Sequence, residues 1–340
     1  MKTYFLYTLL AALSLVQVQA VYGQDSGTAD NPREKRAQTG LQFLSVSMSP
    51  RAAALSDAMV AVDLGSSMAM FYNPAGMASL QGGDLALGNV QWIADIGFNG
   101  GSVAYSPADG QYGTFGFTVM AVDYGELEGT IRSDNEIGYI DTGSFSPTAL
   151  AIGIGYATSL SDRFSIGGTA RYVRQDLGDS IMDADMSSKS NTVSTPVFDF
   201  GVLYRTGFRS FNIGLAVRNF SPSVTYEEES FEAPLLLSIG ASIDVMDLSN
   251  TVSDAHSLLV TAEAGHPRSY SEQIRLGGEY RFMNLVSLRA GYVFPTDEQG
   301  LSAGAGLNLE LGGLRFGADY AYTAFGDLGN VDRLGIRIGF

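Results

Sequence analysis

Arg333-Leu334-Gly335-Ile336-Arg337-Ile338-Gly339-Phe340 ends the chain, and in it apolar residues alternate strictly with Arg or Gly. Because successive side chains of a β-strand point to opposite faces, this period of two predicts a strand between two different environments. The apolar face, formed by Leu334, Ile336, Ile338 and Phe340, also resembles the C-terminal signal by which the outer-membrane assembly machinery recognises barrels. We therefore predict a lipid-facing last strand that carries a barrel-assembly signal. The alternative is an ordinary amphipathic strand that ends in Phe.

The same period of two runs through the chain from Asp84 onward. Fourteen runs show it, at 84–93, 99–106, 112–123, 147–158, 163–175, 196–206, 210–219, 234–245, 256–264, 271–282, 285–294, 299–310, 313–322 and 331–340. Most have 9–12 residues, close to the roughly 9–11 of a tilted membrane strand, whereas soluble strands usually have roughly five or six. The lengths therefore favour strands that cross a membrane.

The connections between these runs fall into two classes if the first strand runs outward. Those at the inner end are mostly short, at 107–111, 159–162, 207–209, 246–255, 283–284 and 311–312. The three longest, 124–146, 176–195 and 220–233, all fall at the outer end, although links 94–98 and 295–298 there are short too. Bacterial barrels have short periplasmic turns and longer extracellular loops. We predict an all-β fold, a transmembrane antiparallel β-barrel of about 14 strands in the outer membrane, over residues 84–340.

Composition agrees with a lipid-facing barrel and excludes other classes. Only 16% of the 340 residues are charged, 41 are Gly, and the aromatic share of 11% is too high for a disordered chain. The net charge of −16 argues against nucleic acid as a partner, since binding phosphates requires a basic patch. With no Cys, the chain has no disulfide and no thiolate metal site.

The first 39 residues are predicted to be export and linker segments. Lys2 precedes an apolar core from Phe5 to Val16, and small-residue cleavage sites follow, so residues 1–23 are predicted to be a secretory signal peptide. The core is too short for a membrane anchor, which needs about 20 apolar residues. Residues 24–39 are polar and are predicted to form a flexible periplasmic tail.

Residues 40–83 lack the period of two and are predicted to form a small, partly helical hatch. Pro50 precedes an Ala-rich run that predicts a helix from Arg51 to Val62, and Asn73-Pro74-Ala75-Gly76 is a strong turn signal. A barrel of about eight strands is just filled by its own side chains, whereas roughly sixteen strands leave a channel. A 14-stranded barrel therefore needs a filling, and residues 40–83 are the candidate plug. A periplasmic cap below the barrel is the alternative.

Charged residues on the polar faces of the strands are expected to line the lumen. We single out Arg275, Glu279, Arg289, Glu310, Arg315, Asp319 and Arg337, and expect the same of Arg163, Arg171, Asp199, Arg205, Arg218, Glu263, Arg281 and Arg333. Opposite charges on neighbouring strands attract each other, which would stiffen the wall. A selective anion path through the lumen is the alternative interpretation.

The three long outer connections are acidic. They hold 13 acidic and 2 basic residues, among them Glu126, Glu128 and Asp141. We interpret them as a solvated rim. The alternatives are divalent-cation bridges to surface lipopolysaccharide, or docking of a basic partner.

No catalytic residue, metal site or cofactor is predicted. His256 and His266 are ten residues apart, and no spacing around them suggests the three or four converging ligands of a metal site. Gly153-x-Gly155 and Gly304-x-Gly306 alternate within predicted strands. They are therefore small lumen-facing or bend positions rather than phosphate-binding loops.

The hatch carries a family resemblance. Phe43-Leu44, Pro50-Arg51-Ala52-Ala53-Ala54-Leu55-Ser56-Asp57-Ala58 and Tyr72-Asn73-Pro74-Ala75-Gly76-Met77-Ala78 together resemble the opening of the PorV/PorQ family. That family is similar in fold to FadL, a fourteen-stranded fatty-acid transporter whose hatch also contains Asn-Pro-Ala-Gly. Members commonly have Met-Gly-Gly or Leu-Gly-Gly where this chain has Leu55-Ser56-Asp57, a mild departure.

The resemblance implies a role beside type IX protein secretion, in the transfer and surface attachment of cargo. Its implied partners are type IX secretion components and cargo C-terminal domains, in addition to outer-membrane lipid, lipopolysaccharide and the barrel assembly machinery. FadL-like uptake of a hydrophobic small molecule is the alternative, and a purely structural barrel is a third.

Overall fold

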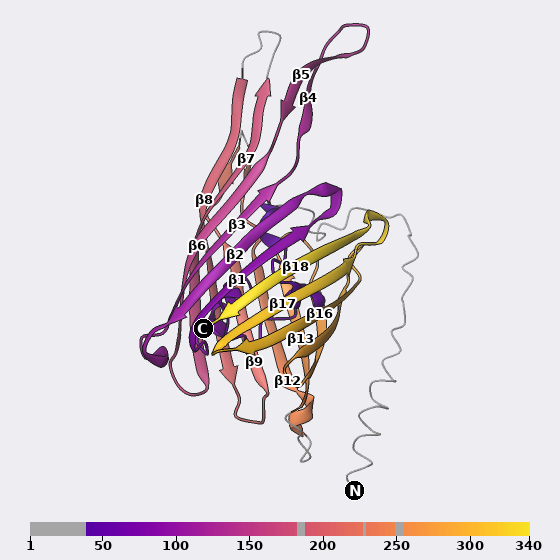
Figure 1. Ribbon diagram of the computed structural model, residues 1–340. Helices are drawn as coiled ribbons and strands as arrows, with labels where there is room; N and C mark the ends of the chain where they lie inside the picture. The colour runs from indigo at the N-terminus through magenta and orange to yellow at the C-terminus, as the bar shows by residue number, and fades with distance from the viewer. Residues whose placement is uncertain (1–38, 182–187, 227–228, 249–254) are drawn as a thin grey trace, which may run out of the picture. The chain divides into compact units, whose positions relative to one another are not determined.

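Fourteen strands form one closed barrel in the computed structural model, which describes residues 39–181, 188–226, 229–248 and 255–340. They are β1 (Gly82–Gln91), β2 (Gly97–Ser106), β3 (Thr114–Asp123), β6 (Thr148–Ser159), β7 (Phe164–Ile181), β8 (Ser188–Arg205), β9 (Asn212–Phe220), β12 (Leu236–Asp244), β13 (His256–Pro267), β14 (Gln273–Phe282), β15 (Val286–Phe294), β16 (Leu301–Leu311), β17 (Leu314–Ala324) and β18 (Asn330–Gly339). Neighbours pair antiparallel, and β1 pairs with β18 to close the sheet (Figure 1). The predicted 14-stranded antiparallel barrel is confirmed.

Two small sheets extend the long connections. β4 (Leu127–Arg132) and β5 (Tyr139–Phe145) form a hairpin separate from the barrel sheet, and Figure 1 shows it beyond the ends of β3 and β6. β10 (Val224–Thr225) and β11 (Ser230–Phe231) form the second. Pairing between β7 and β8 also continues past a bulge at Asp176/Asp179, so the predicted loop 176–195 is largely strand. Hydrogen bonding between β7 and β8 thus extends beyond the apolar alternation by which a strand is recognised in sequence.

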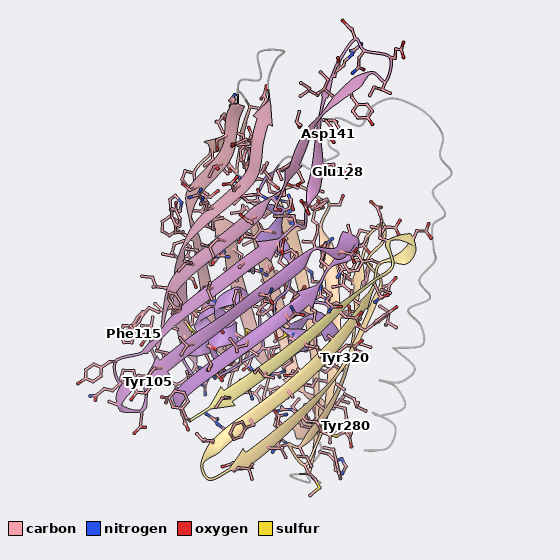
Figure 2. The ribbon with its side chains drawn as sticks, turned by 45° about the horizontal axis from the view of Figure 1, so that its top comes forward. Tyr105, Phe115, Glu128, Asp141, Tyr280 and Tyr320 are labelled. Carbon is pink, nitrogen blue, oxygen red and sulfur yellow. The ribbon has the colours of Figure 1, made fainter. Side chains whose placement is uncertain are left out.

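The outer face of the barrel is apolar, with aromatic residues toward its ends. Leu334 and Ile336 on β18 are 58% and 55% exposed, whereas Arg333, the residue before Leu334, is buried on the inner face. Tyr105 and Phe115 are exposed near one end of the barrel (Figure 2). This arrangement, an apolar band flanked by aromatic residues, is typical of outer-membrane barrels. In the part of the chain that the structure describes, no helix is long and apolar enough to span a bilayer.

Residues 39–81, which we call the N-terminal segment, pack against the inner face of the barrel. The segment contains η1 (Gln42–Ser45), α2 (Pro50–Ala54), η2 (Ser67–Phe71) and η3 (Pro74–Met77). Its Phe43, Leu44 and Met48 are buried in one cluster with strand residues such as Val90 and Met120. The hydrophobic core therefore lies between this segment and the inward-facing side chains of the strands.

The predicted helix from Arg51 to Val62 is wrong in length, since α2 ends at Ala54 after about one turn. Ser56 and Asp57 adopt left-handed backbone conformations, with φ of 51° and 62°, which no helix continues through. The strand residue Glu263 then accepts hydrogen bonds from the backbone N–H groups of Met59 and Val60, each at 3.0 Å. A tertiary partner has taken the place of the helical hydrogen bonds.

The predicted signal peptide, and the predicted tail up to residue 38, lie outside the described residues. Thr39, the last residue assigned to the tail, forms an isolated bridge with Glu232, and its hydroxyl lies 2.6 Å from the Ser269 hydroxyl. Both partners belong to connections at the long-loop end of the barrel, opposite Phe340. Thr39 is therefore not at the short-turn end, where a periplasmic tail was expected.

Candidate functional site

Glycine residues on the strands receive the N-terminal segment. A Cβ atom built at any of twelve strand glycines would come into contact with the backbone or the side chains of this segment. They are Gly88, Gly100, Gly116, Gly155, Gly167, Gly201, Gly214, Gly240, Gly277, Gly291, Gly304 and Gly335, each on a different strand. At Gly88 that Cβ would lie 2.5 Å from the carbonyl oxygen of Met48, closer than real Cβ contacts come. The missing side chains let the two backbones approach around most of the barrel.

Sequence reasoning found part of this glycine ring but not its purpose. Gly155 and Gly304 were predicted to be small lumen-facing or bend positions. Both do face the interior of the barrel, where Gly155 lies against Met70 and Gly304 against Ala54. The signal in the sequence is the recurrence of Gly on the polar face of strand after strand. Nothing in that pattern says which segment the glycines face.

A buried ion network fastens α2 to the wall. Arg51 donates to Glu279 through Nε at 2.7 Å and through Nη2 at 2.8 Å. Glu279, on β14, has no solvent exposure and also accepts from Arg289 Nε at 2.6 Å. Arg289 Nη1 in turn reaches Asp319 Oδ1 at 2.5 Å. Four predicted site residues thus meet in one chain of charges, which runs from the segment across β14, β15 and β17.

Two further carboxylates on the strands bind the backbone of the segment. Glu263 accepts from Met59 and Val60, as described above, and is also paired with Arg275 Nη1 at 3.0 Å. Asp84 Oδ1 accepts from the Ser66 hydroxyl at 2.6 Å and from the backbone N–H of Ser67 at 2.7 Å. Such hydrogen bonds to charged groups are among the strong ones, worth about 1.5–3 kcal/mol each.

The predicted turn motif is a junction within the segment. The Asn73 side-chain amide donates to Val60 O at 2.6 Å and to Val202 O at 2.9 Å on β8, while its oxygen accepts from Ala75 N at 3.1 Å. Pro74, Ala75 and Gly76 form η3, and all three are buried. Asn73 therefore caps η3, ties two parts of the segment together and anchors both to the barrel.

Two arginines of the wall contact aromatic rings. Arg333 donates to Ser47 O at 3.1 Å and lies over the Trp92 ring, 5.7 Å from its centroid. Arg218 lies over the Tyr72 ring at 5.6 Å. Stacking of a guanidinium on a ring face is favourable when both groups are shielded from water.

The other predicted lumen charges divide into two groups. Arg337 faces inward, 3.9 Å from Asp84 Oδ2. Glu310 and Arg315 share the inward register but lie opposite each other at the short β16–β17 turn, and both are exposed. Arg163 is exposed in the turn before β7. The expectation that these last three line the lumen is therefore wrong, because the barrel rim reaches water.

The contacts described above fasten the N-terminal segment to the wall. Among the residues that the structure describes, no three His, Cys, Asp or Glu residues gather in a way that could hold a metal ion. His256 bonds to the Tyr280 hydroxyl at 2.6 Å on the outer face of the barrel, the face opposite to that of the inward residues Glu279 and Arg281. The conspicuous charged groups inside are committed to the segment or to each other.

The long-loop end offers a different kind of surface, the β4–β5 hairpin. Glu128 and Asp141 lie on it (Figure 2), and Leu127, Tyr139 and Ile140 are exposed beside them. At its tip, Ile137 is 71% exposed. Both edges of this two-stranded sheet are unpaired in the described structure.

Solved structures similar to this chain include a hydrocarbon channel and two toluene transporters, all of low sequence identity. The CymD monoaromatic hydrocarbon channel matches with a TM-score of 0.53 and 14% identity, over 87% of this chain and 98% of that chain. The Ralstonia pickettii toluene transporter TbuX matches with a TM-score of 0.54 and 13% identity, over 86% and 97%. The Pseudomonas putida toluene transporter TodX matches with a TM-score of 0.51 and 13% identity, over 79% and 92%. At these identities the likeness shows a FadL-like fold and nothing of the ligand.

Sequence comparison gives the family. No curated protein shows significant similarity to the chain. The family model described as type IX secretion system protein PorV matches residues 29–262, more than half of the chain. This range includes the N-terminal segment, its Asn73 junction and the strands from β1 to β12, and it agrees with the resemblance carried by the hatch motif. The chain belongs to the PorV family of type IX secretion system proteins.

Proposed function

We propose that the protein is a closed, non-catalytic outer-membrane barrel that serves type IX secretion by docking a partner at its long-loop end. The observation that carries the proposal is the fastening of the N-terminal segment inside the barrel. The glycine ring and the carboxylates Glu279, Glu263 and Asp84 hold it from several sides. A lumen filled in this way favours a scaffold over an open conduit.

Export and assembly follow from the sequence. Residues 1–23 would direct secretion, and the lipid-facing residues Leu334, Ile336, Ile338 and Phe340 would present the assembly signal. The anion path through the lumen loses support, because the conspicuous inward charges are paired with the segment or with each other. Lipid and lipopolysaccharide would surround the apolar belt.

The docking surface is assigned to the β4–β5 hairpin. A lone two-stranded hairpin is at best marginally stable in water, and its free edges are templates for another strand. Its acidic residues Glu126, Glu128 and Asp141 favour a basic partner, and its exposed Ile137 and Ile140 favour one that also buries apolar side chains. A secretion component or a cargo C-terminal domain with a basic, extended edge has this chemistry.

The test is charge reversal on the hairpin. The triple variant Glu126→Lys, Glu128→Lys and Asp141→Lys should insert normally but lose most cargo secretion and surface attachment in a host whose native copy is deleted. The matched control is Asp162→Lys, an exposed acidic residue at the short-turn end. Secretion at the wild-type level by the triple variant would show that the hairpin is not the docking surface.

Uptake of a hydrophobic compound, the alternative function, is supported by the fold likeness alone. It predicts that cells lacking the protein grow poorly on a hydrophobic carbon source while secreting cargo normally. We expect instead that such cells grow normally on the hydrophobic carbon source but fail to secrete cargo.

A further inference from the structure

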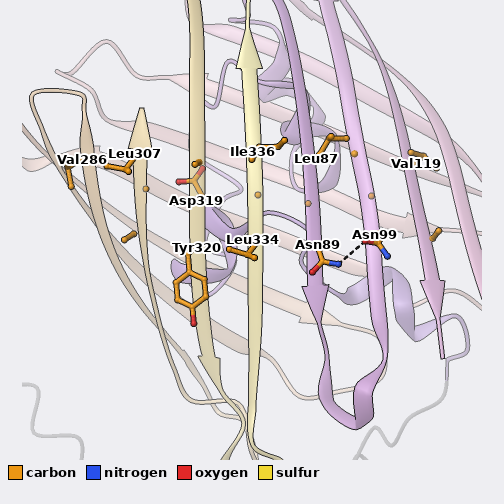
Figure 3. Close-up of a pocket in the computed structure, with 18 residues that line it drawn as sticks. Leu87, Asn89, Asn99, Val119, Val286, Leu307, Asp319, Tyr320, Leu334 and Ile336 are labelled. Atoms are coloured by element: carbon orange, nitrogen blue, oxygen red, sulfur yellow. Dashed lines mark hydrogen bonds between the residues drawn. The ribbon is translucent and has the colours of Figure 1, made fainter. Parts of the chain in front are cut away.

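The barrel wall is hollowed on its outer side where β1, β2 and β18 meet the N-terminal segment. Gly100, Gly88 and Gly335 lie side by side in register on these strands. On the inside, Gly88 and Gly100 face Met48, and Gly335 faces Pro50. Because these three positions have no side chain, β1, β2 and β18 can lie close to the N-terminal segment there. The opposite, lipid-facing side has a cavity of about 1100 Å³ (Figure 3).

The residues that line this groove are of two kinds, small ones, which we call its floor, and large exposed ones. Ala121, Ala305 and Ala318 contribute only methyl groups to the floor, and Gly101 contributes none. At Gly101 a Cβ would lie 2.7 Å from Leu87 Cδ2 and 2.8 Å from Ala86 O, so a larger residue there would meet the neighbouring strand. The exposed side chains that border the groove are Leu87, Leu307, Leu334, Ile336 and Tyr320.

A polar pair marks the end of the groove nearer the long loops. Asn89 and Asn99 face each other on β1 and β2, and Asn89 Nδ2 donates to Asn99 Oδ1 at 2.9 Å (Figure 3). β1 ends only two residues beyond Asn89, so the pair lies near the outer edge of the apolar band. Two amides have more donors and acceptors than one mutual bond uses. Polar side chains facing lipid are costly unless they find partners, and the neighbouring Asp332 and Tyr320 are already paired with each other.

We propose that the groove holds an acyl chain of lipopolysaccharide, the outer-leaflet lipid, with the ester or amide at the head of the chain against Asn89 and Asn99. Three features select this occupant. The groove is continuous with the lipid-facing belt of the barrel, and its lining is apolar apart from Asn89, Asn99 and Asp319, whose carboxylate is bound to Arg289. Its Asn pair lies at the outer edge. A chain anchored from the outer leaflet would run down the groove toward mid-membrane, against a floor of small residues.

The experiment compares lipid retention by the full-length protein after extraction in mild detergent, measured by native mass spectrometry. The variant Ala305→Leu/Ala318→Leu fills the floor of the groove from the lipid side. The matched control, Ala262→Leu/Ala264→Leu, adds the same side chains at exposed positions of β13 outside the groove. Leucine is favourable in lipid, so both variants should insert, and heat-modifiable migration checks that they have done so.

Wild type and control should retain one lipopolysaccharide molecule. The added leucine side chains take up the space of the acyl chain, so the filled variant should lose most of this retention. The variant Asn89→Leu/Asn99→Leu should also lose lipopolysaccharide, although it leaves the floor intact. Equal retention by the filled variant and the control would overturn the proposal, as would retention of phospholipid in place of lipopolysaccharide, or of no lipid, by the wild type.

Discussion

Arg51 and Glu279 are 228 residues apart in the chain, yet they form a two-point ion pair inside the barrel, with Nε–Oε2 at 2.7 Å and Nη2–Oε1 at 2.8 Å. Glu279 is fully buried and also binds Arg289. Arg281 Nε lies 3.3 Å from Glu279 Oε1 as well, so three guanidinium groups surround one buried carboxylate, which is costly to leave without them. The pair therefore ties the position of α2 to the assembled wall of β14 and β15.

Glu279→Gln removes the central charge from this network, so Arg51 loses its carboxylate and Arg289 keeps only Asp319. Breaking a buried ion pair on one side costs about 3–5 kcal/mol, so the free energy of unfolding should fall by that order. Reversible urea unfolding in detergent or vesicles measures the change. Glu310→Gln, at the exposed rim, should stay within about 0.5 kcal/mol of wild type. Equal effects of the two substitutions would mean that the network adds nothing to stability.

Gly214→Ala should displace the N-terminal segment, because a Cβ there overlaps the backbone of Val60. Overpacking of this kind costs about 1–3 kcal/mol. The expected result is faster proteolysis of the segment and a higher conductance of the inserted barrel. Gly278→Ala is the control, since a Cβ at Gly278 meets nothing within 4 Å. If both variants behaved like wild type, the inward-facing glycines would not be needed for packing of the N-terminal segment against the strands.

Phe340 should be needed for efficient insertion. Its backbone pairs with Gly83 in both directions, N–H to O at 2.9 Å and 2.6 Å, and its side chain is exposed on the lipid face. Deletion of Phe340, or Phe340→Asp, should lower the heat-modifiable band in outer-membrane fractions. Phe340→Tyr keeps a terminal aromatic residue and should insert normally. Normal insertion of the deletion variant would contradict the assembly-signal assignment.

Leu288→Arg should test whether the middle of β15 lies deep in the lipid. Leu288 is exposed and flanked by the buried Ser287 and Arg289. An Arg on the lipid face costs about 2–4 kcal/mol at the bilayer midplane and about 0–1 kcal/mol near the interface. Leu311→Arg, at the end of β16, is therefore the control of lower cost. Equal losses in a reversible folding assay would show that depth in the bilayer does not decide the cost at these sites.

The strands were predictable from sequence because successive residues of a barrel wall face lipid and the interior in turn, so apolar and polar residue types alternate. Leu334 faces lipid and Arg333 faces the interior, and that difference is written in the residue types. The N-terminal segment obeys no such rule. Its helix stops at Ala54 because Ser56 and Asp57 turn left-handed and Glu263 binds the following amides, which are tertiary causes.

The site was predictable in its members but not in its pairing. Arg51, Glu279, Arg289 and Asp319 were each identified from sequence, yet only the fold brings them into one network. Glu310 and Arg315 have the same register and residue types but lie where the rim meets water. Position along the strand decided between lumen and rim, and strand ends are the least certain part of any prediction from alternation.

The central claim is that the N-terminal segment closes the barrel. Its most direct test is the conductance of a variant that lacks residues 40–78 but keeps the signal peptide, measured in planar bilayers beside the intact protein. Insertion is checked first by heat-modifiable migration. We expect an inserted barrel with clearly raised conductance, because the filling of the lumen is gone and its wall charges are open to water. An inserted barrel that conducts no more than the intact protein would contradict the claim.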